Sequence, residues 1–521
     1  MNKKVSIYNT ILFLVSPLFL SAQHVLYSPS IINPSTSRFE VIGKAGDYYW
    51  ILKSKKKNSF KKSAEPWKND KDHSFEIYDA RMNLVNIIAT SVSDRPLKKY
   101  FVAGIEYFDQ LTLTKINHKT TALLTRYTAD GSIIHDMVTL ASFPENMNGN
   151  DFLLVQSQDR TKILLLGFEP VEESSPRLHA LLYDKEWRGI SQTICKDKNI
   201  SQPYIQYDFI NYPLTHFDNS PVKLANSGEW LMVSPSGATG NYLLFHFNGI
   251  DSSFLYKQIK LQVNARVSDL VLSLDDKSNE AFVGIMLNTR SRSVKNVILS
   301  HYAISQCRFN FDTSYHFNTL AANKTKNENL VEEYFMAVPG KGFMLLKEYG
   351  RPWSSTYSIE ESRQDDHGED QTNIVFNNTP VLPLNKNEYT RYNNLVGTRS
   401  RFHRGDLSLY YFPATPMDSC WSGIINKEQI TELNSSFLSY VFMPVNNKLV
   451  FLYNNLFNNN NNNNYSSSTI LDQNGNLVNE GLVFWRTNNT LLFQKARQIT
   501  ANELAIPYEK NMRNGFAIIR L

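Results

Sequence analysis

The chain has 521 residues, 42% of them hydrophobic and 12% aromatic, so it can bury a large core and does not have the composition of a disordered protein. Lysine and arginine number 54 against 49 aspartate and glutamate residues, which gives a net charge of only +5 spread along the chain. This balance argues against a nucleic-acid partner.

The first residues have the three parts of a secretory signal peptide. Asn2–Lys4 form a short basic head and Ile11–Leu20 form an apolar run. The small residues Ser21 and Ala22 follow, which predicts cleavage after Ala22. The run is about half of the ~20 residues needed to cross a bilayer and contains Pro17, which argues against a membrane anchor. We therefore predict that residues 1–22 are removed and that the mature protein is extracytoplasmic: periplasmic, on the outer surface or secreted.

Two further features bear on the compartment and on covalent chemistry. The mature chain has no second apolar stretch of ~18 residues, so we expect no transmembrane segment in it. The only cysteines are Cys195, Cys307 and Cys420, too few and too far apart for a disulfide framework. At most one bridge is possible, and we expect each thiol to pack as a small hydrophobic side chain.

Alternation of apolar and polar residues with a period of two dominates the rest of the chain. Ser74–Asp79 alternate in this way, a turn follows, and Leu84–Ile88 continue the pattern, which predicts a hairpin. Ala122–Tyr127 and Ile133–Leu140 predict a second hairpin around Asp130-Gly131, a pair suited to the positive φ of such turns.

The same unit recurs along the chain. Further hairpins are predicted to begin at Leu178–Tyr183, Tyr242–Phe247, Val297–Ile304, Leu407–Phe412 and Ser468–Asp472. Most of them follow a strongly apolar strand, at Tyr48–Leu52, Ile163–Phe168, Trp230–Val233, Ala281–Leu287, Phe343–Leu346 and Leu449–Tyr453. Two hairpins give four strands per unit, and the units recur at roughly 45 to 65 residues, which is the blade period of β-propellers.

The sequence thus predicts an all-β protein, a β-propeller of about seven four-stranded blades between Phe39 and Trp485, with eight possible. One blade cannot cover both of its apolar faces, so blades stack around an axis. Ile499–Tyr508 and Gly515–Leu521 should pair with strand material near Val25–Ile32 or Phe39–Ile42 and close the ring. The alternative is a two-domain β-sandwich, because the spacing is irregular and no signature dipeptide marks each unit.

Three segments interrupt the repeat within residues 23–521, which we predict to form one domain. Lys53–Lys71 contains eight lysines and is predicted to be a solvated loop, with contact to anionic lipid or polysaccharide as the alternative. Gly350–Gly405 is a long insertion, placed between the second and third strands of one blade. Asn454–Asn464 is nearly all asparagine and is predicted to be a loop too polar to join the core.

A series of loose motifs follows Gly405. They consist of Asp406 at the start of a strand, Trp421 after a turn, Ile425, Lys427 and Gln429 in one short motif, and Leu452–Asn455 in a strand. In this order the C-terminal part of the chain, together with the signal peptide, resembles an uncharacterised family of exported, propeller-like proteins of Gram-negative bacteria. Asn426 stands where that family has proline. The resemblance implies the architecture, and no established activity comes with it.

The sequence carries no recognisable metal, cofactor or nucleophile motif. The eleven histidines and three cysteines lack metal-ligand spacing, so we predict neither a metal site nor a cofactor. Asp472–Asn476 begins like a calcium loop, but Leu477 and Val483 stand where glycine and glutamate are required, which favours a hairpin turn. Phosphate-binding glycine loops, nucleophile elbows and dinucleotide fingerprints are absent.

Catalytic residues stay unassigned. A propeller glycosidase would need two carboxylates ~5 to 10 Å apart across the axial pocket. Asp136, Glu229, Asp269 and Glu333 lie near predicted strands, but charged residues at strand edges are usually solvated and nothing selects among these four.

We therefore expect a noncatalytic binding or scaffold module, a monomer that presents loops to a protein or to a cell-surface component such as a polysaccharide. The alternative is an extracytoplasmic glycan-active hydrolase or lyase that uses the axial pocket. A structural component of a surface assembly is a third possibility, and it would show a broad exposed apolar patch on the side of the ring.

Overall fold

The computed structural model describes residues 25–29, 37–55, 73–89, 96–170, 177–197, 200, 220–235, 242–248, 254–259, 266–288, 294–318, 329–338, 341–362, 372–376, 379–384, 396–414, 419–427, 429–431, 440–445, 448–455, 465–480, 490–510 and 513–521. These residues form β-strands and two single 3-10 turns, Gly149–Asp151 and Phe493–Lys495. This part of the chain contains no helix of the length and hydrophobicity that a membrane span requires.

The strands form eight antiparallel sheets, which we number as blades 1 to 8. Seven of them are made of strands that follow one another along the chain, and blade 8 combines strands from both ends. Blades 1 to 4 are β2–β5 (Ser37–Ala45, Tyr48–Lys55, His73–Tyr78, Leu84–Ala89), β6–β9 (Lys98–Ala103, Tyr107–Ile116, Lys119–Thr128, Ile133–Phe143), β10–β13 (Phe152–Gln156, Lys162–Glu169, Arg177–Asp184, Gly189–Lys196) and β14–β17 (Val222–Leu224, Trp230–Pro235, Tyr242–Phe247, Phe254–Ile259). Blades 5 and 7 are β18–β21 (Arg266–Asp275, Glu280–Asn288, Val294–Ala303, Arg308–Asn318) and β29–β32 (Tyr440–Val445, Lys448–Asn455, Tyr465–Leu471, Leu477–Glu480).

Blade 8 joins the two ends of the chain. Its C-terminal strands are β33 (Thr490–Leu491), β34 (Arg497–Thr500), β35 (Glu503–Lys510) and β36 (Arg513–Arg520), and β1 (Val25–Tyr27) pairs with β36 as the outermost strand. The predicted pairing of the two ends is therefore confirmed. A turn divides the expected single strand at Ile499–Tyr508 into β34 and β35.

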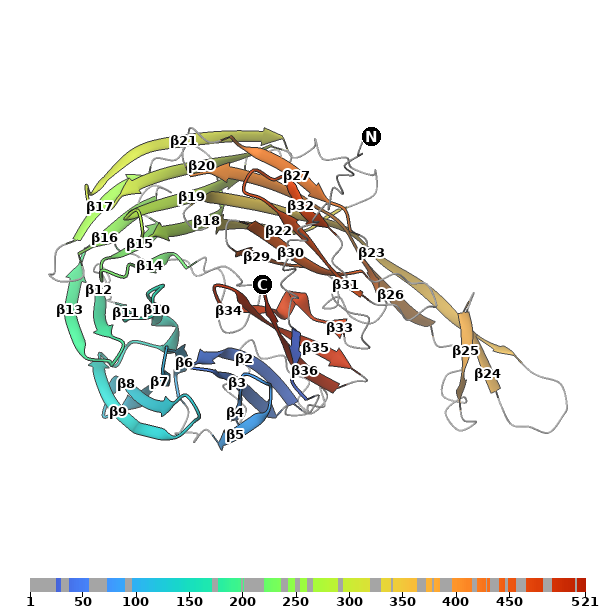
Figure 1. Ribbon diagram of the computed structural model, residues 1–521, viewed down its shortest axis with the longest axis horizontal. Helices are drawn as coiled ribbons and strands as arrows, with labels where there is room; N and C mark the ends of the chain where they lie inside the picture. Colours follow the sequence, from blue (N-terminus) through green and yellow to red (C-terminus); the bar gives the residue numbers. More distant parts are fainter. Residues whose placement is uncertain are drawn as a thin grey trace, which may run out of the picture.

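The ring has eight blades, the larger of the two predicted numbers. Seven of them lie between Ser37 and Glu480, which matches the seven repeats counted in that span. The count differs because the terminal strands were expected only to close the ring, whereas together they make a complete blade. Figure 1 shows this last blade beside the first.

The hydrophobic core lies between the blades. Eight buried clusters each join two successive blades, and together they include the pair formed by the last blade and the first. Trp50 of blade 1, for example, stacks on Phe108 of blade 2 with ring centroids 3.9 Å apart. Between blades 8 and 1, Phe516 packs with Tyr49 and Tyr78. Successive sheets thus cover each other's apolar faces around a ring, and the two-domain sandwich alternative is wrong.

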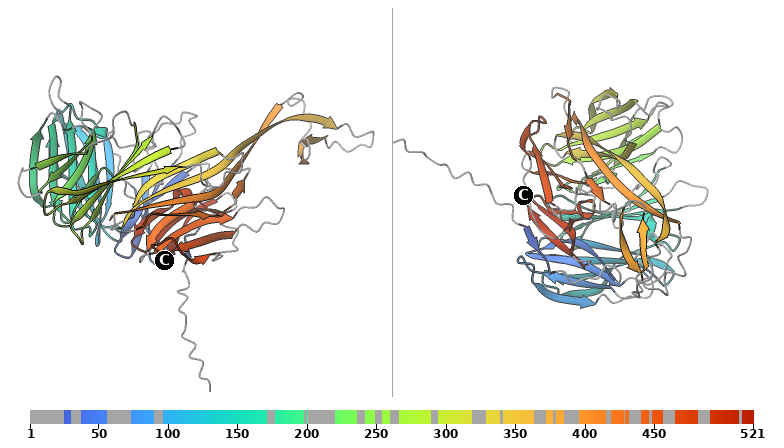
Figure 2. Two further views of the ribbon diagram at one scale, coloured as in Figure 1. Left: turned by 90° about the horizontal axis from the view of Figure 1, so that it is seen from above. Right: turned by 90° about the vertical axis from the view of Figure 1, so that its right-hand side faces the viewer.

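Blade 6 carries a long two-stranded arm. The blade itself consists of β22 (Asn329–Val338), β23 (Gly342–Ser362), β26 (Val396–Pro413), β27 (Trp421–Ile425) and β28 (Gln429–Thr431). β23 and β26 run beyond the blade as a paired ribbon, and β24 (Thr372–Phe376) and β25 (Thr379–Leu384) pair farther out along it. The insertion at Gly350–Gly405 therefore lies where it was predicted, between the second and third strands. Figures 1 and 2 show it projecting away from the ring.

The two low-complexity segments begin inside strands. Lys53–Lys55 end β3, and residues 56–72 of the lysine-rich segment lie outside the described residues. Asn454 and Asn455 end β30, while residues 456–464 are not described either. Asn454 is buried, so the expectation that the whole tract stays out of the core is wrong at this residue. Its amide is accommodated because it is hydrogen-bonded, as described below.

Candidate functional site

One turn residue in each of five blades contacts the blade before it. The turns between the third and fourth strands of blades 1, 2, 3, 5 and 7 each place one residue at a φ of 50 to 99°: Met82, Gly131, Trp187, Cys307 and Gly475. The N–H of each residue donates to the carbonyl oxygen three residues earlier, as in three-residue hairpin loops that end in a left-handed residue. We call these five the latch residues. The side chains of Met82, Trp187 and Cys307 contact the preceding blade. At the two glycines, side chains of the preceding blade occupy the place where a Cβ would be.

The Trp187 latch of blade 3 completes a buried ion pair of blade 2. The Trp187 Nε1–H donates to Asp109 Oδ2 at 2.8 Å. Arg126 donates to both oxygens of the same carboxylate, at 2.8 and 3.0 Å, and also pairs with Glu186 beside the latch. Burial lowers the pKa of Arg126, but hydrogen bonds and attraction from the two carboxylates raise it by more, so the guanidinium stays charged.

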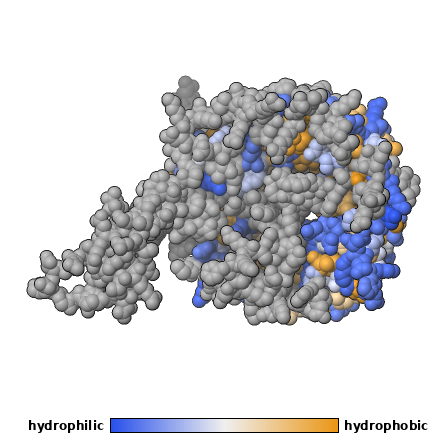
Figure 3. All heavy atoms as spheres, turned by 180° about the vertical axis from the view of Figure 1, so that it is seen from behind, coloured by the Kyte–Doolittle hydropathy of each residue, from blue (hydrophilic) through white to orange (hydrophobic). Residues whose placement is uncertain are grey.

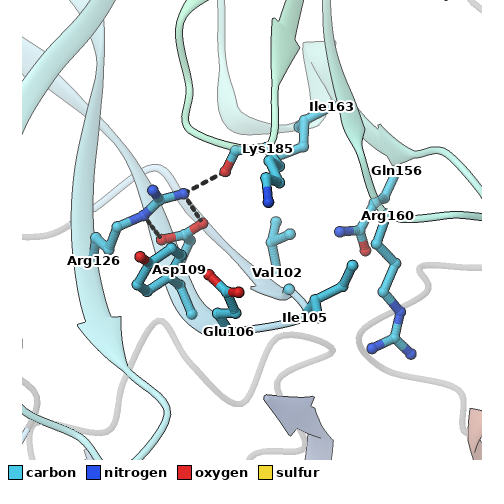
Figure 4. A pocket seen from close by; sticks show the side chains of 11 residues that line it. Val102, Ile105, Glu106, Asp109, Arg126, Gln156, Arg160, Ile163 and Lys185 are labelled. Atoms are coloured by element: carbon cyan, nitrogen blue, oxygen red, sulfur yellow. Dashed lines mark hydrogen bonds and ion pairs between the residues drawn. The ribbon is translucent and has the colours of Figure 1, made fainter. Parts of the chain in front are cut away.

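A small polar cavity borders this ion pair (Figure 4). Its charged lining residues are Glu106, Asp109, Arg126, Arg160 and Lys185. The cavity measures about 20 Å³, which is room for about one water molecule. Pockets for sugars or cofactors usually measure ~300 to 1,000 Å³, so this cavity suits an ordered water within a blade joint.

The turns between first and second strands form a belt at one end of the ring. Asp159 N–H donates to Asn226 Oδ1 at 3.1 Å, and Asn226 N–H donates to Asp276 Oδ1 at 2.9 Å, which links blades 3, 4 and 5. Arg160 donates to the Ile499 carbonyl of blade 8 at 2.6 Å. Arg160 also donates to the Lys44 carbonyl of blade 1 at 3.4 Å, so its side chain joins blade 3 to two blades that are not its neighbours.

The four candidate carboxylates lie on four different blades. Asp136 is exposed on β9, the outer strand of blade 2, and Glu229 is half-buried beside a turn of blade 4. Asp269 and Glu333 are half-buried on β18 and β22, the adjacent inner strands of blades 5 and 6. Glu333 pairs with Lys347 at 3.5 Å. The structure brings Asp269 and Glu333 to neighbouring strands and leaves Asp136 and Glu229 elsewhere.

The predicted hairpin turn at Asp472 is confirmed. Asp472 accepts hydrogen bonds from the N–H groups of Asn474 and Asn476, both at 2.8 Å, and from the Asn476 side chain. These bonds, led by the one from the Asn476 side chain, lower the pKa of Asp472. The carboxylate oxygens thus hold the turn itself together, as in other Asx turns.

All three cysteines are free thiols. Cys195 packs in the core between blades 3 and 4, as predicted for each thiol. Cys307 is half-buried and Cys420 is exposed, so the prediction is wrong for Cys420. Nothing in the spacing of the cysteines distinguishes the three environments.

Three of the residues that carry the resemblance, Lys427, Gln429 and Asn454, belong to a buried polar network. The Lys427 Nζ pairs with the Glu348 carboxylate, and both side chains are fully buried. Lys427 also donates to Gln429 Oε1 at 2.9 Å, and Gln429 Nε2 donates to the Asn454 carbonyl of blade 7 at 2.6 Å. Asp406 accepts from the Lys427 N–H at 3.2 Å. The short motif therefore joins blade 6 to blade 7.

The network continues beyond these residues. Asn454 Nδ2 donates to the Leu491 carbonyl of blade 8 at 2.6 Å. Trp421 Nε1 donates to the Gln473 carbonyl of blade 7 at 2.9 Å, and Ile425 lies in the core between blades 6 and 7. Each of these residues has a structural role at a blade joint.

Comparison with known proteins gives structural matches only. No protein-family model matches the chain, and no curated protein sequence matches it. The β-propeller domain of the Trilobed protease from Pyrococcus furiosus matches at 9% identity and a TM-score of 0.33, covering 82% of this chain and 94% of that one. The Nup133 β-propeller domain of Vanderwaltozyma polyspora matches at 8% identity and a TM-score of 0.31, covering 95% and 100%.

An enzyme is among the other matches. The GH93 α-L-arabinofuranosidase of Fusarium graminearum matches at 10% identity and a TM-score of 0.27, covering 72% of this chain and 95% of that one. Similarities of this size do not bear on what the present chain binds or catalyses.

Proposed function

We propose that this protein is a binding module, a rigid ring that holds a protein partner against the outer strands of blades 1 to 3. The observation that carries the proposal is a set of large aliphatic side chains that are 40 to 57% exposed on these strands. We call this set the outer band; it consists of Leu84, Val85 and Ile87 of β5, Ile133, Ile134 and Val138 of β9, and Ile190 and Ile194 of β13.

The outer band continues from one blade to the next. Asn86 Nδ2 on β5 donates to the Asp130 carbonyl in the turn before β9, at 3.2 Å, which holds the first two outer strands together. Figure 3 shows hydrophobic atoms among hydrophilic ones on the side of the ring away from the arm, where blades 2 to 4 lie. Exposed apolar side chains gathered on neighbouring strands are typical of interaction sites.

The chemistry of the outer band favours a protein over a polysaccharide. All eight of its side chains are aliphatic, and aromatic rings are what sugar faces stack on. The fully buried core of a protein interface is apolar and poor in charged residues, so it can accept these aliphatic side chains.

The test is recovery of partners from envelope extracts by three proteins. The wild type is compared with an outer-band variant, Ile87→Lys with Ile133→Lys, and with a matched variant on the outer strand of blade 5, Asp312→Lys with Ser314→Lys. We expect the wild type and the blade 5 variant to recover the same protein and the outer-band variant to lose it. Equal recovery by all three, or no specific recovery by any, would contradict the proposal.

Self-association is a separate outcome of the same comparison. We propose that the chain is a monomer, so sedimentation should give the mass of one chain for the wild type and for both variants. If the wild type sediments as a larger species and only the outer-band variant is monomeric, the outer band is occupied by a second copy instead of a different protein.

A glycan-active enzyme is the second candidate, because Asp269 and Glu333 lie on adjacent inner strands. Two carboxylates near the axis are the arrangement that glycoside hydrolysis uses. The test is an activity screen on polysaccharides with the wild type and with Asp269→Asn and Glu333→Gln variants. Activity that both variants lose would support an enzyme, and its absence from the wild type would remove this candidate.

We also propose that the protein works outside the cytoplasm, supported by the signal-peptide pattern and by the resemblance to exported proteins. The expected N-terminal residue of the protein recovered from cells is Gln23. Intact-mass measurement checks this, and recovery of the chain with Met1 in place would contradict export by cleavage.

A further inference from the structure

One latch residue is a thiol next to an imidazole. Cys307, the latch residue of blade 5, lies with its Sγ 3.7 Å from Nδ1 of His246 on the third strand of blade 4. The other ring nitrogen, Nε2, lies 3.7 Å from Oε1 of Glu229, an electrostatic contact longer than a hydrogen bond. Thiol, imidazole and carboxylate therefore stand in series, the order found where a base activates a nucleophile and an acid orients the base.

The burial of the three groups suits this order. His246 is buried, whereas Glu229 and Cys307 are half-buried, so Cys307 borders solvent while the imidazole is shielded. Burial is the largest influence on the pKa of His246 and lowers it. The imidazole is therefore neutral at pH 7 and has a lone pair that can accept a proton. A proton taken on Nδ1 would create an imidazolium facing the Glu229 carboxylate.

A second hydrogen-bond donor competes with the thiol. The Tyr302 hydroxyl lies 3.1 Å from His246 Nδ1, and the Cys307 thiol also lies 3.4 Å from the Ile304 carbonyl. Burial raises the pKa of Tyr302, so its hydroxyl remains a donor. Tyr302 and Cys307 therefore compete for the same nitrogen, Nδ1 of His246. Removing the Tyr302 hydroxyl should leave this nitrogen to the thiol and make Cys307 more reactive.

Blade 5 holds a similar pair without a thiol. His301 Nε2 lies 3.2 Å from Glu280 Oε1, and its Nδ1 faces the Asn310 side chain at 3.4 Å. As in blade 4, the histidine is on the third strand and the glutamate is at, or directly before, the beginning of the second. A histidine–glutamate pair is therefore a repeated structural feature of neighbouring blades. Its combination with a solvent-accessible latch thiol is the particular feature of the joint between blades 4 and 5.

We infer that Cys307 is a reactive thiol, activated by His246 and Glu229, and that it exchanges with small disulfides to form a mixed disulfide. The thiol proton passes to His246 Nδ1 as the sulfur attacks one sulfur of the disulfide. A new S–S bond forms, the old one breaks, and the leaving thiolate takes the proton back from the imidazolium. The products are the mixed disulfide and one small thiol, with no other oxidant needed.

The other two thiols of the chain supply internal references. Burial raises the pKa of Cys195 to about 11, and burial is also the largest influence that raises the pKa of Cys420. Cys195 should react only if the protein unfolds, so it reports on folding. Cys420 is exposed, so it shows how fast an accessible thiol reacts without a base.

The experiment treats the purified, reduced chain with oxidised glutathione at pH 7.5 and follows each cysteine by peptide mass spectrometry. We expect Cys307 to react faster than Cys420. His246→Gln should slow Cys307 by about tenfold, because a thiol without a base is only about one-tenth thiolate at pH 7.5, and it should leave Cys420 unchanged. Tyr302→Phe should speed Cys307, and the matched control His301→Gln should leave it unchanged.

Two results would overturn the inference. One is a Cys307 rate no higher than that of Cys420, and the other is an unchanged Cys307 rate in a His246→Gln protein whose Cys195 stays protected. If Cys195 becomes reactive in His246→Gln, that variant has lost its fold and Glu229→Gln is used in its place. Glu229→Gln must then slow the reaction of Cys307 while Cys195 stays protected. A purely structural role for the cluster would change stability in these variants but not the ratio of the Cys307 and Cys420 rates.

Discussion

At the scale of single residues, the blade joints combine apolar packing with a few fully buried charges. Arg126 and Asp109 are both almost completely buried between blades 2 and 3. A buried ion pair of this kind adds little compared with a well-packed apolar pair, but removing one partner leaves the other charge without compensation. Such residues therefore make a joint sensitive to substitution.

Arg126→Met should destabilise the protein by about 3–5 kcal/mol, because it leaves the Asp109 carboxylate buried with only Trp187 as a donor. Arg188→Met is the matched control, since this arginine is exposed in the same turn as Trp187. Urea unfolding followed by tryptophan fluorescence measures both. Equal midpoints for the two variants would show that the ion pair contributes little.

His246 should make the stability of the fold depend on pH. Its folded pKa lies below the ordinary value of 6.5, so the unfolded chain binds the proton more readily. The stability it contributes is therefore complete above about pH 6.5 and declines as the pH falls below that value. Thermal unfolding at pH 5 and pH 7.5 should show a smaller difference in His246→Gln than in the wild type; an equal difference would assign the pH dependence to other groups.

At the scale of elements, the hairpin turns decide how one blade meets the next. A left-handed latch position is open to glycine at no cost, but Met82, Trp187 and Cys307 adopt it as well. In each of these cases the strain accompanies a side chain that contacts the preceding blade. Gly131 is different, because the preceding blade fills the space where a side chain would be.

Gly131→Ala should destabilise the protein by about 1–3 kcal/mol, since the new Cβ would combine a left-handed backbone with overpacking. That Cβ would come within 2.4 Å of the Ile77 side chain. The matched control is Gly189→Ala, because a Cβ there meets nothing within 4 Å. Thermal unfolding compares the two, and a neutral Gly131→Ala would mean that the Ile77 side chain moves aside easily.

At the scale of the whole molecule, a three-residue strand from the N-terminus closes the ring. β1 pairs with β36, and the Tyr508 hydroxyl donates to the Ser28 carbonyl at 2.6 Å. Val25 and Tyr27 pack against the core between blades 7 and 8, and Leu26 packs against the core between blades 8 and 1. Closure therefore fastens blade 8 to both of its neighbours.

A chain that begins at residue 37 should be less stable than one that begins at residue 23, by about 2–4 kcal/mol for the lost burial of three apolar side chains. The shorter chain also leaves the edge of β36 unpaired, which favours self-association. Thermal unfolding and sedimentation of the two chains are the measurements. Identical stability would show that blade 8 holds its place without β1.

The sequence by itself determined the strands, their grouping into four-stranded units and the pairing of the two ends. The strands and their grouping follow from short-range alternation and turn chemistry, as at Asp130-Gly131, which depend only on neighbouring residues. The pairing of the two ends was inferred differently, because a ring of blades has to close. The sequence also indicated an insertion in blade 6, because Gly350–Gly405 breaks the repeat. It could not show that this insertion is largely a paired ribbon, since that pairing joins residues far apart in the chain.

Only the tertiary structure decided which polar side chains meet. Cys307, His246 and Glu229 are separated by up to 78 positions and share no motif spacing, yet stacking of blade 5 on blade 4 brings them together. The same stacking buries Lys427 with Glu348 and separates Asp136 from the other carboxylates. Local patterns determine each blade, whereas a site between blades depends on the angle and register at which two sheets pack.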